Sequence, residues 1–421
     1  MINFRGTRSR QEGRGTRPGG AISRRELLTM VLPHDEVVPF IKYDLCPGSQ
    51  ACGLCRDVCP SEAIEINDGQ ITVDATLCKG CGACVAICPH RAIHHPTLSP
   101  EQLDRELKKI LPAKEAPSGI IAFTCRQCAV PEDRAEEPAY SGDVTRREVP
   151  CLAAVSPWLI LRALERGAPG VALVHSNNGC PTGFSPELWQ ENTRFVQALG
   201  KVWGIEPERC RVIAGDDPRD LARQLSRFAQ EIKHLKPTPL SAYEPAPIPS
   251  RSLLLPTLIK DWRDKLGKPV KSTVTAGAVP FGRLELDTSR CSACSLCASA
   301  CPTGALTAAA DKKERIYQLL FQHELCLGCS RCLKACPEQC LKLEKILELD
   351  RLGKPPVVLF EDKMARCREC GHTISPQATI NKLQKKLADY SPTSHLELCP
   401  RCKANLFTRG KTGSGDNGHI L

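Results

Sequence analysis

The segments CSACSLCASACP at residues 291–302 and CLGCSRCLKACP at residues 326–337 decide how this chain folds. Both have the spacing C-x2-C-x2-C-x3-C-P, which puts four cysteines on one short stretch. A [4Fe-4S] cluster needs four thiolates. In this spacing the first three cysteines bind one cluster, and the fourth, before proline, binds its neighbour. The two segments therefore predict two clusters whose ligands cross between them.

The crossing rule assigns the ligands and predicts that residues 281–347 form a 2[4Fe-4S] ferredoxin module. The first set is Cys291, Cys294, Cys297 and Cys336, and the second set is Cys326, Cys329, Cys332 and Cys301. Disulfides are the alternative use of these cysteines, but they require an oxidising compartment and do not explain a doubled spacing.

An earlier part of the chain, residues 36–98, repeats the pattern with one departure. In CPGSQACGLCRDVCP, residues 46–60, three extra residues lengthen the first ligand loop, whereas CKGCGACVAICPH, residues 78–90, is regular. The predicted ligand sets are Cys46, Cys52, Cys55 and Cys88 for one cluster, and Cys78, Cys81, Cys84 and Cys59 for the other. Residues 63–66 and 70–73 predict a hairpin between the two segments. We therefore expect a second 2[4Fe-4S] ferredoxin module here.

Residues 117–236 alternate between predicted strands and helices. The strands are 119–123, 147–149, 170–174 and 210–214, and the helices are 157–166, 186–203 and 218–235. This alternation predicts a flavodoxin-like parallel sheet with helices on both faces. Cys125, Cys128, Cys151 and Cys180 all follow the carboxyl end of a strand, where open α/β sheets bind ligands.

Four segments of this region carry a family resemblance: FTCRQCA at 123–129, VPC at 149–151, ILRALERGAPGVALV at 160–174 and GIEPERCRVI at 204–213. The region resembles the delta subunit of methyl-viologen-reducing hydrogenase. The resemblance implies a [2Fe-2S] centre on Cys125, Cys128, Cys151 and Cys180. It also implies two partners. One is a catalytic subunit of the hydrogenase or formate dehydrogenase type, and the other is a heterodisulfide-reductase-like flavoprotein.

The resemblance has one departure, and it leaves an alternative open. The family usually has two cysteines in the loop after the third strand, whereas this chain has only Cys180 there. Four candidate ligands still remain, which is enough for [2Fe-2S]. The alternative is that these cysteines are ordinary buried thiols, since free cysteine is often a small core residue.

The remaining cysteines lie near the C-terminus, beyond a Pro-rich linker predicted at 237–280 that we expect to be a semi-rigid spacer. Residues 357–408 contain two knuckles that suit tetrahedral zinc, Cys367, Cys370, Cys399 and Cys402, with a helix predicted between them at 378–387. Together they predict a small zinc ribbon. Rubredoxin-like iron is the alternative. Cys210 and Cys340 are left over and are interpreted as structural.

The two ends of the chain are expected to lack a core. Residues 1–35 predict a disordered or short helical arm, and residues 409–421 a flexible tail. Arg24 and Arg25 resemble a twin-arginine export signal, but the apolar stretch after them is interrupted at 33–36, which favours the cytoplasm. No apolar run approaches the ~18 residues of a membrane span, so no direct membrane insertion is expected.

The net charge of +10 counts all 26 cysteines as neutral. Four cubanes, one [2Fe-2S] cluster and one zinc site would each add about −2, which brings the loaded protein to about −2. The basic residues then serve mainly as counter-charge, and Arg366, Arg401 and Lys403 are interpreted as a solvated face. No nucleic-acid partner is expected.

These features favour a non-catalytic, polyferredoxin-type electron-transfer subunit of a larger oxidoreductase complex. The sequence has no G-x-G-x-x-G after a strand, no P-loop and no radical-initiating C-x3-C-x2-C. One alternative is an iron–sulfur reductase with its own substrate-active cluster, which would need an adjacent cysteine pair or an incompletely ligated cluster. A second is a redox-sensing zinc-ribbon regulator, which would show salt-dependent binding to DNA.

Overall fold

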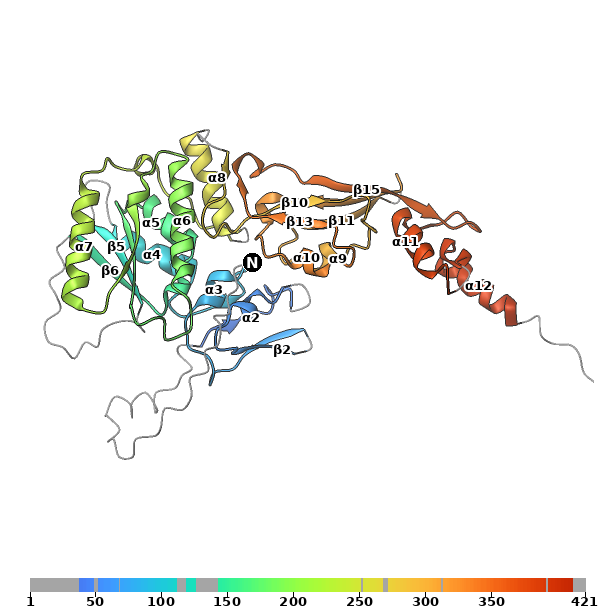
Figure 1. Ribbon diagram of the computed structural model, residues 1–421, viewed down its shortest axis with the longest axis horizontal. Coiled ribbons are helices and arrows are strands. Elements are labelled where there is room, and N and C mark those ends of the chain that lie inside the picture. Colours follow the sequence, from blue (N-terminus) through green and yellow to red (C-terminus); the bar gives the residue numbers. More distant parts are fainter. Residues whose placement is uncertain are drawn as a thin grey trace, which may run out of the picture. The chain divides into compact units, whose positions relative to one another are not determined.

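A computed structural model of the chain describes residues 38–48, 52–67, 69–111, 119–125, 143–250, 253–267, 272–311, 313–390 and 393–411. The predicted N-terminal arm, Cys128 and residues 412–421 lie outside the described residues. The described chain divides into two compact units, which Figure 1 colours along the sequence. Unit 1 extends to Val279 and takes back residues 346–352, and unit 2 contains residues 280–345 and the chain from Gly353 onward.

The N-terminal module of unit 1, the described residues of 38–98, consists of short elements around buried cysteines. They are β1 (Phe40–Ile41), α2 (Leu54–Val58), β2 (Ile64–Asn67), β3 (Gln70–Val73), α3 (Ala83–Ile87) and β4 (Ile93–His94). β1 pairs with β4, and the predicted hairpin is confirmed, with β2 antiparallel to β3. Ile64, Ile71 and Ile93 pack with Cys55 and Cys84, so the ligand turns lie against a small apolar core.

The α/β domain of unit 1 is built on a parallel four-stranded sheet. Its elements are α4 (Pro100–Ile110), β5 (Ile120–Cys125), β6 (Val144–Val149), η3 (Leu152–Ala154), α5 (Pro157–Glu165), β7 (Val171–His175), α6 (Glu187–Lys201), η4 (Pro207–Arg209), β8 (Cys210–Ala214) and α7 (Pro218–Lys233). The strand order is β6-β5-β7-β8, and every neighbouring pair is parallel. The predicted parallel sheet is confirmed, and the chain reverses its direction of winding between β5 and β7.

Both faces of this sheet are buried. Ile120 and Ala122 pack against Phe228 of α7, while the alternating residues Ile121 and Phe123 are buried on the opposite face. α7 begins where the sequence requires it, because the Asp217 side chain accepts a hydrogen bond from the Asp220 N–H at 2.7 Å and proline follows at the first helical position. Packing on both faces therefore fixes the position of the carboxyl edge of the sheet.

Residues 237–280 are not the spacer that their proline content predicts. The segment contains η5 (Pro239–Ala242), α8 (Leu254–Leu266) and β9 (Thr273–Val274). Trp262 of α8 is completely buried, with its ring centroid 6.2 Å from that of Trp203, and Trp203 Nε1 donates to the Gly267 carbonyl at 3.2 Å. The apolar residues of α8 recur at helical spacing, so the helix packs as a part of unit 1.

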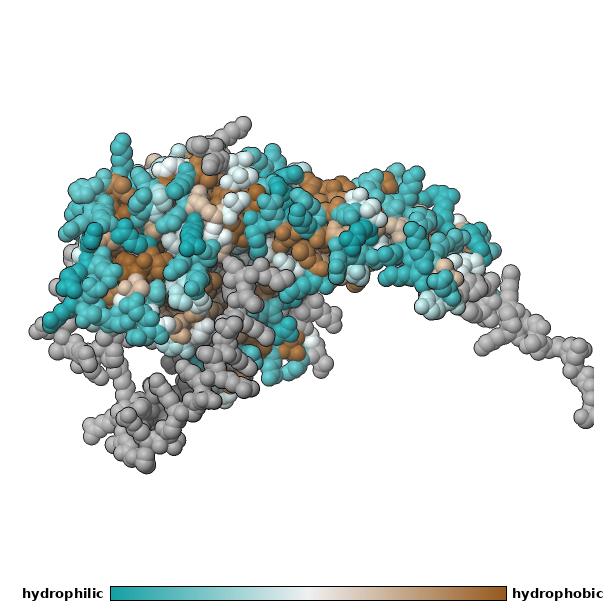
Figure 2. Space-filling model, in the orientation of Figure 1, coloured by the Kyte–Doolittle hydropathy of each residue, from teal (hydrophilic) through white to brown (hydrophobic). Residues whose placement is uncertain are grey.

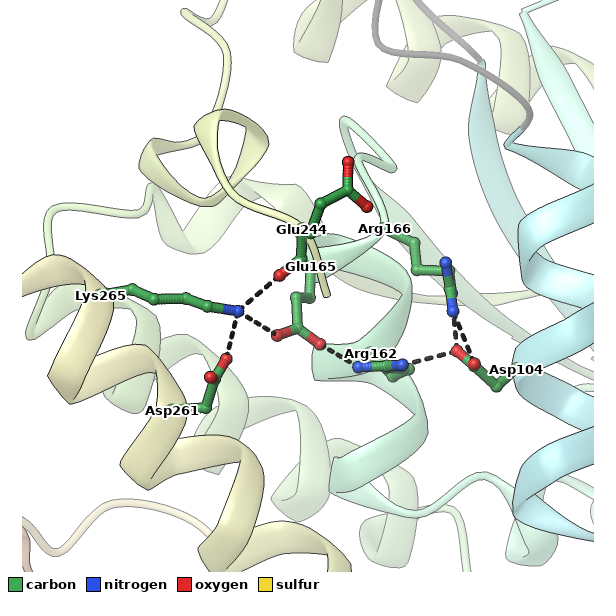
Figure 3. Close-up of polar contacts among 7 residues, drawn as sticks. All are labelled: Asp104, Arg162, Glu165, Arg166, Glu244, Asp261 and Lys265. Atoms are coloured by element: carbon green, nitrogen blue, oxygen red, sulfur yellow. Dashed lines mark hydrogen bonds and ion pairs between the residues drawn. The ribbon is translucent and has the colours of Figure 1, made fainter. Parts of the chain in front are cut away.

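A chain of ion pairs fixes α8 to the α/β domain (Figure 3). Asp104 of α4 accepts from Arg162 of α5 at 2.7 Å and from Arg166 at 2.6 Å. Arg162 also donates to Glu165 at 2.6 Å, and Nζ of Lys265 in α8 lies 3.9 Å from Glu165. Arg162 and Glu165 are both almost fully buried, so removing either would leave a buried charge without its partner.

After residues 280–345, which belong to unit 2, the chain returns to unit 1. β14 (Leu347–Glu348) pairs with β9, and it is followed by η7 (Leu349–Arg351). Leu347, Leu349 and Leu352 are buried, and Arg263 of α8 donates to the Leu352 carbonyl at 2.7 Å. Residues 346–352 are therefore part of the unit 1 core, although the residues on either side of them belong to unit 2.

Unit 2 joins the C-terminal module, residues 281–345, to the last cysteines through one sheet. Its elements are β10 (Arg283–Leu286), α9 (Leu296–Ser299), β11 (Leu306–Asp311), β12 (Ile316–Phe321), η6 (His323–Leu325), α10 (Arg331–Ala335), β13 (Leu341–Glu344), β15 (Val357–Arg366), β16 (Thr373–Pro376), α11 (Gln377–Leu387), η8 (Ser394–Glu397) and α12 (Pro400–Lys411). The strand order β11-β12-β15-β16 crosses the predicted boundary between module and ribbon. α11 matches the helix predicted at 378–387, whereas α12 continues to Lys411 where a tail was predicted from 409.

The described surface is mostly polar. On the face that Figure 2 shows, hydrophilic residues predominate and apolar residues form separate patches between them. Among the helices of the described residues, none has the length and apolar character needed to cross a bilayer.

Candidate cluster and metal sites

The cysteine-containing turns share a backbone conformation with left-handed residues at fixed places. In the three regular turns, the residues two and four places after the first cysteine are left-handed. They are Gly80 and Gly82, Ala293 and Ser295, and Gly328 and Ser330. This conformation costs a non-glycine residue about 1–2 kcal/mol, so the turns are held by their surroundings. In all three turns a backbone N–H points at the first sulfur: from Gly80 to Cys78 and from Gly328 to Cys326, each at 3.4 Å, and from Ala293 to Cys291.

The thiols of the N-terminal module gather in the predicted crossed sets. Burial, followed by Cys88 and Cys52, raises the pKa of Cys55 to about 12, and Cys46 adds to the effect. Burial also raises the pKa of Cys84 and of Cys81, and in Cys81 the thiol of Cys59 adds more to this effect than any other thiol. Cys88 thus lies with the first set and Cys59 with the second, although each comes from the other segment.

The C-terminal module repeats this arrangement. Burial, then Cys291 and Cys294, raises the pKa of Cys297 to about 11, with a smaller effect from Cys336. Burial, then Cys326, Cys329 and Cys301, raises the pKa of Cys332 to about 12. Without metal these thiols are protonated at neutral pH, so each cluster must displace protons when it binds.

Both ligand sets of this module line cavities that suit a cluster. Besides the four predicted ligands of each set, the linings are mainly apolar, including Leu284, Phe321 and Leu343 in one cavity and Leu286, Leu319 and Leu341 in the other. Thiolates facing an apolar enclosure are the donor set that iron–sulfur clusters use. The residues present therefore fit the cofactor.

A lysine lies beside one of these ligand turns. Burial lowers the pKa of Lys345, and Cys326 and Cys329 act in the opposite direction. A Cβ added to Gly328 would lie 2.7 Å from its Nζ, so glycine leaves room for this cation. Lys345 thus stands where a counter-charge would act on the thiolates of Cys326 and Cys329, as the composition predicts.

The α/β domain brings three of its predicted cysteines to the carboxyl edge of the sheet, where the winding reverses. Cys125 is the last residue of β5, Cys151 follows β6, and Cys180 follows β7. The sulfurs of Cys151 and Cys180 are 3.8 Å apart, and the Cys125 thiol donates to the Pro150 carbonyl at 3.6 Å. Open α/β sheets bind ligands at this switch point. The fourth predicted ligand, Cys128, lies outside the described residues.

Thr182 is a member of this site that sequence reasoning missed. Its Oγ1 lies 2.9 Å from the Cys180 sulfur and 3.5 Å from the Cys151 sulfur, and the residue is buried. Hydrogen bonds from Cys151 and then Thr182 lower the pKa of Cys180 to about 5, whereas hydrogen bonding with Cys125 and Cys180 raises that of Cys151. Only the tripeptide Cys-Pro-Thr could have indicated this residue.

The α/β site adjoins one ligand turn of the N-terminal module. Burial is the main cause that raises the pKa of Cys81 to about 11, and Cys180 is among the thiols that add to it. A Cβ added to Gly82 would lie 3.0 Å from the Cβ of Ala154, in the turn after Cys151. One added to Gly183 would lie 3.8 Å from the Cβ of Pro60. The set of Cys59, Cys78, Cys81 and Cys84 is thus in contact with the α/β site.

The last four cysteines form a compact group. The sulfurs of Cys367, Cys370, Cys399 and Cys402 lie within 4.8 Å of one another, and those of Cys370 and Cys399 are 3.7 Å apart. Tetrahedral zinc with sulfur ligands at about 2.3 Å places those sulfurs about 3.8 Å apart. The first knuckle closes through the N–H of Gly371, which has φ +71° and donates to the Cys367 carbonyl at 2.8 Å. A tetrahedral iron site would have the same shape.

The two left-over cysteines differ. Cys210 is the first residue of β8, and burial raises the pKa of its thiol to about 12. Cys340, in contrast, places its sulfur 3.5 Å from that of Cys336 and lines the cavity of that ligand set. The interpretation of Cys340 as a structural residue at the module edge is therefore incomplete.

Comparisons with known proteins agree with this arrangement. Residues 120–236 match the family model of the methyl-viologen-reducing hydrogenase delta subunit. Residues 290–340 match a 4Fe-4S dicluster domain, and residues 46–99 match an LdpA Fe-S cluster-binding domain. A search of the curated proteins found no match to the chain. The chain is thus an iron–sulfur electron-transfer protein with a domain like the hydrogenase delta subunit.

Proposed function

We propose that this chain passes electrons from a catalytic subunit of the hydrogenase or formate dehydrogenase type to a heterodisulfide-reductase-like flavoprotein, or in the reverse direction. It would bind four [4Fe-4S] clusters on the crossed sets of its two modules and one [2Fe-2S] cluster in the α/β domain. Its last four cysteines would bind one zinc. The partners rest on the likeness of residues 120–236 to the delta subunit.

The contact between two ligand turns is the observation that supports this proposal most. Each cluster, once bound, would take up and release one electron at a time. Gly82 has no side chain, which lets the turn of Cys81 approach Ala154 in the turn after Cys151. A direct contact of this kind suits electron exchange between the N-terminal module and the α/β domain.

Among the described residues, each proposed cubane ligand set has four thiols or more, so none would leave the open iron position that a substrate-active cluster would need. The positive charge is also matched to the thiolates, as at Lys345. A carrier is therefore better supported than a reductase with its own substrate or a DNA-binding regulator.

Metal analysis of the anaerobically purified full chain tests the cofactor content. We expect about 18 iron and about one zinc per chain. About 16 iron would remove the cluster of the α/β domain, and about 8 would remove one of the two modules. About 19 iron without zinc would assign iron to the last four cysteines.

A second experiment tests the role. The chain alone should accept electrons from a strong reductant and reduce an artificial dye, without turnover of hydrogen, formate, NAD or a disulfide. Together with the two partners from the native complex, it should connect their half-reactions. Turnover of one of these substrates by the pure chain, lost on substitution of one cluster ligand, would make it an enzyme instead.

A further inference from the structure

Cys340 lies at the corner of a proposed cluster site that already has four cysteines. Its sulfur is 3.5 Å from that of Cys336, and it lines one cavity together with Cys291, Cys294 and Cys297. The residue is only 7% exposed, so its thiol faces the cavity and not solvent. This ligand set therefore contains five sulfurs where a cubane uses four.

The four cluster-binding turns show why this thiol is placed there. Each turn has a left-handed residue three places after its last cysteine. These residues are Glu62 (φ 54°), Arg91 (φ 53°), Gly304 (φ 68°) and Gln339 (φ 48°). In all four turns the N–H of this residue also donates to the carbonyl of that cysteine, at 3.2–3.4 Å. The four turns thus share this backbone feature, and the residue four places after the cysteine follows it in each.

That position carries alanine in three turns and cysteine in the fourth. The residues are Ala63, Ala92, Ala305 and Cys340. In one alanine turn the N–H of Ala92 donates to the Cys88 sulfur at 3.4 Å, and the N–H of Cys340 bonds to the Cys336 sulfur in the same way. The side chain at this position therefore begins beside the ligand sulfur, as a methyl group in three turns and as a thiol in the fourth.

Two of the other turns have a hydroxyl near the same sulfur, but from a different position. Ser61 Oγ lies 3.6 Å from the Cys59 sulfur, and Thr303 Oγ1 lies 3.8 Å from the Cys301 sulfur and donates instead to the Leu325 carbonyl at 2.6 Å. Thiolate is the ligand that iron–sulfur clusters use. Among the four described turns, only the turn of Cys336 has a thiol at the position four places after its last cysteine.

We propose that Cys340 is a reserve ligand for the iron that Cys336 would bind in the proposed cluster of Cys291, Cys294, Cys297 and Cys336. In the exchange, the bond from iron to the Cys336 sulfur would break and a bond from iron to the Cys340 sulfur would form. The proton of the Cys340 thiol moves to Cys336, so the charge is unchanged and no electron is transferred. The inference rests on the proposed function, because it assumes that this site binds a cluster.

Iron and sulfide content of the anaerobically purified full chain, with the electron paramagnetic resonance of the reduced clusters, tests the inference. Cys336→Ala should keep nearly the wild-type iron, because Cys340 loses its proton to solvent and takes the vacated position. Cys336→Ala with Cys340→Ala should lose about four iron and one cubane signal. Cys340→Ala alone should lose none. Equal iron loss in Cys336→Ala and the double variant would overturn the inference.

The other cluster of the same module provides matched controls. Cys301→Ala should lose about four iron, because Ala305 stands where Cys340 stands in the other turn. Ala305 lines the cavity of its own ligand set, so a thiol there has room, and adding Ala305→Cys should restore the iron. If it does not, position alone does not make a reserve ligand, and the inference fails.

Cys297→Ala separates this inference from the proposed function, because Cys340 also hydrogen-bonds with Cys291 and could replace that residue as well. Loss of about four iron in Cys297→Ala, with equal loss in Cys336→Ala, overturns the reserve ligand but leaves the proposed cluster intact. No loss of iron in Cys297→Ala overturns the cluster at this site, and the reserve ligand with it.

Discussion

A Cβ added to Gly82 would lie 3.0 Å from the Cβ of Ala154, so these two residues bring two cysteine-containing turns into close contact. Gly82 lies between Cys81 and Cys84, and Ala154 ends the turn after Cys151. The same Cβ would lie 2.2 Å from Leu98 Cδ1. Contact between the N-terminal module and the α/β domain thus depends on the absence of one side chain.

Gly82→Ala should lower the free energy of unfolding and separate the two turns. The left-handed backbone, with φ +77°, costs alanine about 1–2 kcal/mol, and crowding against Leu98 and Ala154 adds about 1–3 kcal/mol. Gly69→Ala is the matched control, since Gly69 has φ +83° and open space around its Cβ position. Equal melting temperatures for the two variants, measured by differential scanning calorimetry, would contradict the close contact.

The same contact predicts a magnetic interaction between reduced centres. When the proposed cluster of Cys59, Cys78, Cys81 and Cys84 and the proposed centre of the α/β domain are both reduced, their electron paramagnetic resonance signals should be broadened by each other. Cys81→Ala should remove the broadening and leave a narrow signal from the α/β domain. Cys294→Ala, in the other module, is the control and should leave the broadening unchanged. A signal of the α/β domain that is equally narrow in wild type and Cys81→Ala would be the contrary result.

Trp262→Ala should destabilise unit 1 by about 3–5 kcal/mol, because the side chain is completely buried. Tyr243→Ala changes an aromatic residue of the same segment that is 39% exposed, and its effect should be much smaller. Urea unfolding followed by circular dichroism provides the comparison. Similar urea midpoints for the two variants would instead support the spacer that the proline content predicts.

Asp104 should make the stability of unit 1 depend on acid pH. Burial raises the pKa of its carboxyl, but hydrogen bonds from Arg166 and Arg162 outweigh burial and hold the pKa below the usual value. A lowered pKa in the folded state gives stability that is present above the unfolded value of about 3.9 and is lost as pH falls through the folded pKa. Asp104→Asn should therefore destabilise the protein at pH 7 and have little effect at the lowest pH.

The control for this titration is Asp264→Asn, because the Asp264 side chain is 66% exposed and forms its ion pair with Arg263, its neighbour in the chain. Its effect on the free energy of unfolding should stay small at every pH. A pH-independent difference between wild type and Asp104→Asn would show that the ion pairs of Asp104 do not supply the stability.

The parts of the fold that the sequence predicts correctly are those with local causes. The spacing of cysteines along a turn predicts the crossing of Cys88 and Cys59, and the structure brings Cys88 near Cys55 and Cys59 near Cys81. The α/β domain is predictable for the same reason, since each of its strands and helices has its own apolar period. Both depend on residues that are close in sequence.

The parts that the sequence does not predict depend on distant partners or on a misleading composition. β15 pairs with β12, which the sequence around Val357 does not indicate, so a boundary between module and ribbon was predicted within one sheet. The prolines of 237–250 mask the helical spacing of Pro256, Ile259 and Trp262. The role of Cys340 is hidden because the shared pattern of the four turns extends beyond Cys-Pro, to the position where the other three carry alanine.

The route of the chain through the two units has a consequence for synthesis. Unit 1 needs residues 346–352, because β14 is the partner of β9 and Leu347 belongs to its core. The ribosome reaches these residues only after it has made the whole C-terminal module. Unit 1 therefore cannot complete its folding when its own domains have emerged. A nascent chain arrested before Ile346 should leave β9 open to proteases that no longer cut it after Leu352 has emerged. The ribosome therefore completes the C-terminal module, which contains the proposed reserve ligand Cys340, before unit 1 has all the residues of its fold.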